Sequence, residues 1–123
     1  MTASNIIKKA MTLLGYADME GNTDFARFQL TSITAVNAIY SDLYYLNKKE
    51  GFKPVASAND SVNLEERVLN DVMPYGVASF IAQNMGDTVN QQFYSQMYNL
   101  KRKTVSAQST ITDALPSVET EGA

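Results

Sequence analysis

The amino-acid sequence predicts an all-α protein, a small bundle of four to five helices with one long central helix and an extended C-terminal arm. Apolar residues recur every three or four positions between residues 23 and 50, and no glycine or proline interrupts that stretch. Pro74 opens a second apolar stretch that ends at Gly86, which is typical of a helix with proline in its first turn. The last seventeen residues have no helical period. The 123 residues therefore predict one helical domain over residues 1–106 and an arm over residues 107–123.

The first helix is predicted over residues 5–14. Ser4 or Asn5 can cap its start, and Gly15 can end it in the left-handed conformation that glycine favours. Its buried face is predicted from apolar residues at helical spacing: Ile6, Ile7, Ala10, Met11 and Leu14.

The long central helix is predicted to start at a cap formed by Asn22 or Thr23. It ends at Lys48 and Lys49, cations suited to a helix C-terminus, before Gly51. Its stripe consists of Phe25, Phe28, Ser32, Val36, Ile39, Leu43 and Leu46.

Residues 52–62 are predicted to form a loop, because Pro54 and a run of Ser, Asn and Asp break the periodicity. Asn63 is predicted to cap a short third helix over residues 64–71. The fourth helix follows from Pro74 to Gly86 and is apolar nearly all round, which predicts burial at the centre of the fold. One side of it is predicted to contain Tyr75, Ala78, Ile81, Ala82 and Met85.

Small residues at Gly76 and Ala78 are expected to let a neighbouring backbone come close to the fourth helix. The fifth helix is predicted to start at Asp87 or Thr88 and to end near residue 106. Its apolar stripe is predicted to be Phe93, Tyr94, Met97, Leu100 and Val105.

The composition argues against an enzyme and against a bound cofactor or metal. There is no cysteine and no histidine, which removes most metal ligation, the usual nucleophiles and the usual general base at neutral pH. The carboxylates are scattered, and no phosphate-binding glycine motif is present. The chain also lacks a long apolar run and a signal-peptide pattern, so we expect an intracellular product without a membrane span.

The net charge of −3 is unevenly distributed along the chain. Residues 1–103 contain ten basic and ten acidic residues, whereas the last twenty contain Asp113, Glu119 and Glu121 and no base. A balanced body with an acidic tail argues against a dedicated DNA-binding protein, which usually has a basic surface.

Two groups of side chains are candidates for contact with a partner. Tyr40, Tyr44 and Tyr45 cluster near the end of the central helix, where they suit either a protein interface or the half-buried edge of the core. The triplet Lys101, Arg102 and Lys103 suits either the last turns of a helix, through its dipole, or an acidic or phosphate-bearing partner.

The arm is the third candidate. It combines a solvated composition with the apolar residues Ile111, Leu115 and Val118 and with Pro116. Such a segment either stays disordered or becomes ordered when it binds a neighbouring protein.

The order of elements resembles a known family. A hairpin that begins Asp71-Val72-Met73-Pro74-Tyr75-Gly76-Val77-Ala78 and closes with Lys101-Arg102-Lys103 is similar to the C-terminal helical hairpin of the head-to-tail connector (adaptor, or head completion) proteins of long-tailed bacteriophages. The segment Leu115-Pro116-Ser117-Val118 resembles the C-terminal extension of that family. The likeness covers nearly the whole chain, with residues 1–106 as the adaptor domain.

The resemblance implies a structural virion protein of the neck, made in the host cytoplasm. Family members form a ring, typically dodecameric, beneath the portal protein, and an arm engages the portal or a neighbouring copy. The other face of the ring receives the next connector or tail protein, and genomic DNA passes through the channel without specific binding. The resemblance implies no catalytic residue and no cofactor.

A small helical regulatory or nucleic-acid-binding protein is the alternative. It would need a helix-turn-helix with a basic recognition helix, whereas the basic residues here are divided among several helix ends. A shift in gel mobility with DNA at low salt would distinguish it from a connector, and a metal-dependent rise in melting temperature would reveal a metal protein.

Overall fold

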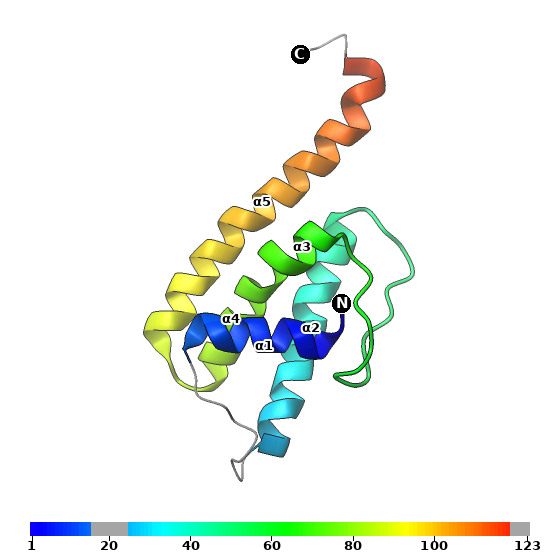
Figure 1. Cartoon of the computed structure of the whole chain (residues 1–123). Coiled ribbons are helices and arrows are strands. Elements are labelled where there is room, and N and C mark those ends of the chain that lie inside the picture. Colours follow the sequence, from blue (N-terminus) through cyan, green and yellow to red (C-terminus); the bar gives the residue numbers. More distant parts are fainter. Residues whose placement is uncertain (16–24, 119–123) are drawn as a thin grey trace.

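The computed structural model of the chain describes residues 1–15 and 25–118, with side chains for residues 1–15 and 31–105 (Figure 1). The described part contains five helices, and the predicted all-α fold class is confirmed. They are α1 (Ala3–Leu14), α2 (Phe25–Leu46), α3 (Glu66–Asp71), α4 (Met73–Asn84) and α5 (Thr88–Val118). The one β-type contact in these residues is an isolated bridge between Thr2 and Ser61.

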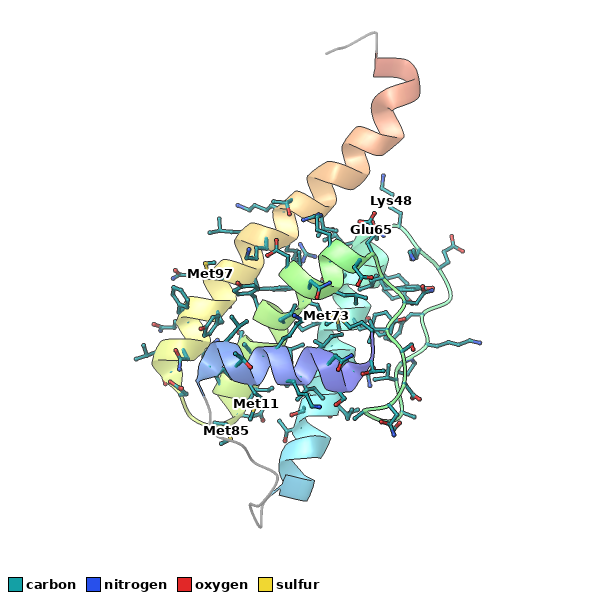
Figure 2. All side chains as sticks on the ribbon, viewed as in Figure 1. Met11, Lys48, Glu65, Met73, Met85 and Met97 are labelled. Carbon is teal, nitrogen blue, oxygen red and sulfur yellow. The ribbon has the colours of Figure 1, made fainter. Side chains whose placement is uncertain are left out.

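Helix α4 is the centre of the bundle and contacts each of the other four helices (Figure 1). Most of its side chains are fully buried, as expected for a helix that is apolar nearly all round. Figure 2 shows Met73 in the interior and Met85 at the edge of the domain. The predicted end at Gly86 was two residues too late, because α4 ends at Asn84 and Met85 is its exposed C-cap.

Three helix ends lie at or beside the positions that the sequence predicts. Gly15 ends α1 in the left-handed conformation, with φ of 72°, as predicted. Thr2 rather than Ser4 or Asn5 caps α1, and its side chain accepts a hydrogen bond from the backbone N–H of Asn5. The Asp87 carboxylate accepts from the N–H of Asn90 and caps α5, as expected.

Two predicted ends were misplaced. Helix α2 ends at Leu46, because Lys48 adopts a positive φ of 61° that breaks the helical hydrogen bonding before Lys49. Helix α3 starts at Glu66, and Asn63 does not cap it. Instead, the N–H of Asn63 donates to the hydroxyl of Tyr40 at 3.0 Å. The predicted caps Asn22 and Thr23 of α2 lie outside the described residues.

The connection between α2 and α3 is a loop, as predicted, and it is anchored at several points. The side-chain nitrogen of Asn37 donates to the carbonyl of Val55 at 2.9 Å. The side-chain oxygen of Asn37 accepts from the backbone N–H of Val55 at 2.8 Å. The backbone N–H of Val62 donates to the carbonyl of Met1 at 3.0 Å. Val55 and Val62 are buried, so the loop contributes to the core.

Helix α5 continues to Val118, so the predicted boundary at residue 106 and the extended conformation of residues 107–118 were wrong. The backbone of these residues is helical. Figure 1 shows that this part of α5 projects beyond the rest of the bundle. Val105 is buried and is the last residue of α5 whose side chain the structure describes. The arm is therefore a helical continuation of α5, not a separate extended segment.

Gly76 permits a close approach of side chains, not of a backbone as predicted. A Cβ atom at this position would lie 2.8 Å from Cδ1 of Ile39 on α2 and 2.9 Å from the ring of Tyr98 on α5. The Tyr98 ring therefore occupies the space that any larger residue at position 76 would need.

Replacement of Gly76 by alanine should destabilise the protein, although alanine is the better helix former. Overpacking of a core costs about 1–3 kcal/mol, whereas the gain in helix propensity is about 1 kcal/mol. The free energy of unfolding from denaturant titration measures the balance. Gln83→Ala, at an exposed position of the same helix, is the control and should be neutral. A Gly76→Ala protein as stable as wild type would contradict the close approach of Tyr98.

Candidate interaction surface

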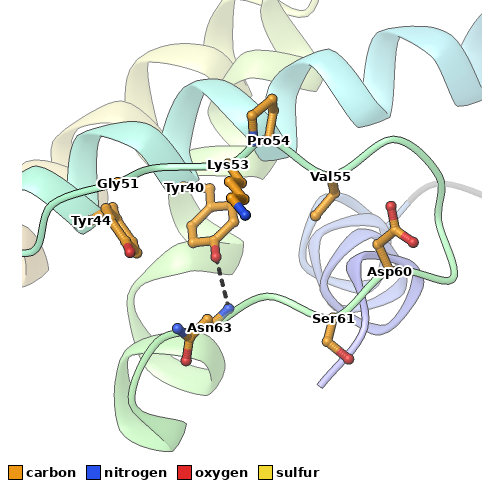
Figure 3. A pocket seen from close by; sticks show the side chains of 9 residues that line it. All are labelled: Tyr40, Tyr44, Gly51, Lys53, Pro54, Val55, Asp60, Ser61 and Asn63. Carbon is orange, nitrogen blue, oxygen red and sulfur yellow. Dashed lines mark hydrogen bonds between the residues drawn. The ribbon is translucent and has the colours of Figure 1, made fainter.

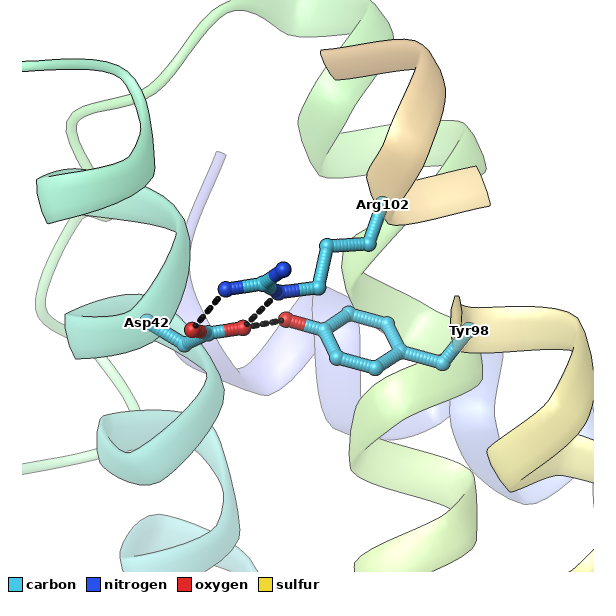
Figure 4. Close-up of polar contacts among 3 residues, drawn as sticks. All are labelled: Asp42, Tyr98 and Arg102. Atoms are coloured by element: carbon cyan, nitrogen blue, oxygen red, sulfur yellow. Dashed lines mark hydrogen bonds and ion pairs between the residues drawn. The ribbon is translucent and has the colours of Figure 1, made fainter. Parts of the chain in front are cut away.

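Three side chains join α5 to α2 where α5 leaves the body (Figure 4). Asp42 comes from α2, and Tyr98 and Arg102 lie one turn apart on α5. The Tyr98 hydroxyl donates to Oδ2 of Asp42 at 2.6 Å. The Arg102 guanidinium donates from Nε to Oδ2 at 2.6 Å and from Nη2 to Oδ1 at 2.8 Å. This two-point contact is the strong form of an arginine–carboxylate pair.

The electrostatics of this junction favour a charged Asp42 and a neutral Tyr98. The hydrogen bonds from Arg102 lower the pKa of the Asp42 carboxyl, although partial burial opposes them. Burial, together with the charged Asp42 carboxylate that accepts a hydrogen bond from its hydroxyl, raises the pKa of Tyr98. At neutral pH Asp42 is therefore charged and Tyr98 is neutral, so the hydrogen bonds of the junction are all present.

The basic triplet does not lie in the last turns of a helix, because α5 continues to Val118. Arg102 is engaged with Asp42. Lys101 forms an ion pair with Asp71 at 3.1 Å and lies 4.7 Å from the centre of the Tyr75 ring. Lys103 is exposed and contacts no described partner. Two of the three predicted contact residues thus serve the fold, and Lys103 remains available to a partner.

The tyrosine cluster is divided between the core and the surface. Tyr40 is only 4% exposed and holds the loop through Asn63, so it is not on the surface. Tyr44 is partly buried, and its ring packs edge-to-face against Tyr40 and Phe52. Tyr45 is 57% exposed. Contact of Tyr44 and Tyr45 with a partner stays a prediction.

A shallow groove of about 410 Å³ lies beside this cluster (Figure 3). Its walls are Tyr40, Tyr44 and the loop around Pro54. The Asp60 carboxylate in its lining accepts hydrogen bonds from the N–H groups of Ala56 and Ser57 at 2.7 and 3.1 Å, so it shapes the loop. The Asp60 carboxylate is therefore already used by the loop that forms the groove.

Among the residues whose side chains are described, three exposed apolar residues lie on the outer face of α5, which we call the outer stripe: Val89, Phe93 and Leu100. Their exposures are 77%, 52% and 60%. At 3.6 residues per turn these positions form one narrow strip, and Tyr94 and Tyr98 lie on the other side of the helix, against the body.

The prediction that Phe93 and Leu100 belong to the buried stripe was wrong. Tyr94 and Tyr98 are the residues that face the body, and both are held there by their hydroxyl groups. The hydroxyl of Tyr94 donates to the carbonyl of Leu13 at 2.6 Å. A helix with apolar residues on two sides can bury only one of them in a bundle of this size. A plot of α5 at helical angles would have revealed both sides.

The predicted contact residues of the arm are Ile111, Leu115, Pro116 and Val118. Their backbone belongs to α5, and their side chains lie outside the described part of the structure. In the described part of the chain, no helix combines the length and apolar composition that crossing a bilayer requires. The same residues contain no group of three or more potential ligands placed to bind a metal ion.

Comparison of the chain with protein-family models, with curated proteins and with solved structures found no match.

Replacement of Tyr98 by phenylalanine should lower the free energy of unfolding by about 1–2 kcal/mol, because the partly buried Asp42 carboxylate loses a hydrogen bond. Denaturant titration measures the change. Asp71→Asn is the matched control, because it removes the more exposed ion pair with Lys101, and such pairs contribute about 0–1 kcal/mol. Equal effects of the two substitutions would contradict the assigned role of the junction.

The junction also predicts how stability depends on pH. The pKa of Asp42 is lowered in the folded protein. Its contribution to the free energy of unfolding is therefore present above pH 3.8, the unfolded value, and is lost as the pH falls below that value. The pKa of Tyr98 is raised from 10.0, so its contribution to the free energy of unfolding is lost as the pH rises above 10.0. Unfolding free energies of wild type and Asp42→Asn across acid pH test this, and the variant should show the weaker acid loss.

Proposed function

We propose that this chain is a structural virion protein that joins a phage portal to the tail or to the next connector protein. It would form a ring, dodecameric as in the family that its sequence resembles, and continue the DNA channel. The proposal rests on the resemblance and on one structural feature: a helical body with a long C-terminal helix that projects from it and exposes an apolar outer stripe. Exposed apolar strips of this kind are typical of protein–protein contact surfaces.

The division of α5 into two sides supports a role in assembly. Tyr94 and Tyr98 attach the first half of α5 to the body, and the Asp42 junction secures it at the point of departure. The anchored half gives the projecting half a fixed direction. An arm that is aimed in this way reduces the entropy lost when it binds the portal or a neighbouring copy.

The charges of the body suit a conduit for DNA that does not bind its bases or backbone tightly. Lys101 and Arg102 are engaged by Asp71 and Asp42, which leaves Lys103 as the member of the triplet that reaches solvent. One such cation gives little phosphate binding at physiological salt. This observation favours the connector over the nucleic-acid-binding alternative.

Electron microscopy of the purified protein mixed with the portal of the same genome tests the proposal. The expected result is a dodecameric ring of this protein stacked coaxially on the portal. The portal alone and the protein alone are the controls. A protein that ignores the portal under these conditions, yet shifts DNA in a gel at low salt, would replace the connector with the regulatory alternative.

Deletion of residues 107–123 should abolish attachment to the portal while leaving the melting temperature close to that of wild type. The deletion begins after Val105, so it removes helical turns of α5 and leaves every described core residue in place. Thermal unfolding followed by circular dichroism and the same microscopy assay give the two readouts. A truncated protein that still forms rings on the portal would contradict a role of the arm in attachment.

A further inference from the structure

We infer that the outer stripe of α5 binds the projecting half of α5 from a second copy of this chain, head to tail. This inference deepens the proposed ring and rests on it for its biological setting. It identifies the contact between neighbouring subunits as helix against helix. Three properties of α5 support it: the exposed face of the anchored half, the sequence register of the projecting half, and the sizes of the residues in both.

Helix α5 follows two series of positions seven residues apart, as in a coiled coil. One series is Phe93, Leu100, Ala107 and Ala114, and the other is Met97, Thr104, Ile111 and Val118. The exposed residues Phe93 and Leu100 of the outer stripe belong to the first series. Seven of the eight positions are apolar, and Thr104, where the anchored half meets the projecting half, is the exception. A seam of this kind needs a second helix with the same repeat.

The two halves of the seam are complementary in size. The anchored half presents the large residues Phe93, Met97 and Leu100, whereas the first series continues in the projecting half as Ala107 and Ala114. A shift of two heptads sets Phe93 of one copy beside Ala107 of the next, and Leu100 beside Ala114. Large residues then pack against small ones in these two layers, and Met97 of one copy lies level with Ile111 of the next.

The unshifted arrangement is less favourable. Two α5 helices paired in parallel without the shift would set Phe93 against Phe93 and Ala107 against Ala107, so that large residues meet large ones and small residues meet small ones. The occupant with both the matching repeat and the matching residue sizes is therefore the projecting half of another copy.

The projecting half also needs a partner for its own stability. Most of the stability of a helix in a protein comes from packing of its apolar face, and a segment that leaves the body lacks that packing unless a partner supplies it. Residues 107–118 extend beyond the body in Figure 1. In a pair formed through this contact, one copy still has a free outer stripe and the other still has a free projecting half. Further copies can therefore add, and the chain of copies closes into a ring when the rotation between neighbouring subunits allows it.

Two complementary variants test the inference. The first, Phe93→Glu with Leu100→Glu, alters the anchored half, and the second, Ile111→Glu, alters the projecting half. Sedimentation at increasing protein concentration should show self-association of wild type and its loss in each variant alone. An equimolar mixture of the two variants should form a single species of two copies, because one intact contact can still form between them.

Two further variants are controls that add the same charge away from the seam. Gln92→Glu, exposed on α5 beside the stripe, and Ser109→Glu, at the register position opposite the seam in the projecting half, should associate as wild type does. Circular dichroism verifies that each variant is folded. Two variants that fail to restore association when mixed, or a wild type whose mass stops at a symmetric dimer, would overturn the head-to-tail contact.

Assembly on the portal separates this inference from the proposed function. Loss of rings with each variant, together with rings of wild type, supports both. Normal rings of both variants would overturn the α5 contact and leave the connector function in place. Wild type that self-associates through α5 but ignores the portal would retain the contact and refute the connector function. Wild type that neither self-associates nor forms rings would overturn both.

Discussion

The packing of the Tyr98 ring against Gly76 determines how the rest of the bundle is arranged. Because position 76 has no Cβ, the ring lies directly on α4, and α5 comes close enough for the Tyr98 hydroxyl to reach Asp42 on α2. Arg102, one turn further on, completes the carboxylate's set of donors. One small residue thus lets three helices meet at a single polar junction at the edge of an apolar core.

This junction also divides α5 into two parts with different roles. The first part is attached to the body by tyrosines whose rings are packed against it and whose hydroxyl groups find defined acceptors. From residue 107 to Val118 the backbone continues as a helix that projects from the bundle. On the side of the helix opposite the tyrosines, Val89, Phe93 and Leu100 stay exposed.

Much of the fold could be predicted from local signals. Gly15, Pro74 and Asp87 mark helix ends by backbone chemistry that operates within a few residues, and each appears where expected. The candidate site was less accessible to such reasoning. Phe93 and Leu100 look like core residues by type and spacing, and Arg102 looks like a surface contact. Their actual roles depend on which side of α5 meets the body, and no local signal along α5 specifies that choice.

By itself, the sequence determined the helical class, the number and order of the helices, the central place of the apolar fourth helix and the absence of histidine and cysteine chemistry. These properties follow from periodicity, capping and composition, which are local or additive along the chain. Only the tertiary structure decided the length of α5, the burial of Tyr40 and the exposure of the outer stripe. Those properties depend on contacts between residues such as Asp42 and Arg102, sixty positions apart, which compete for limited space around one small core.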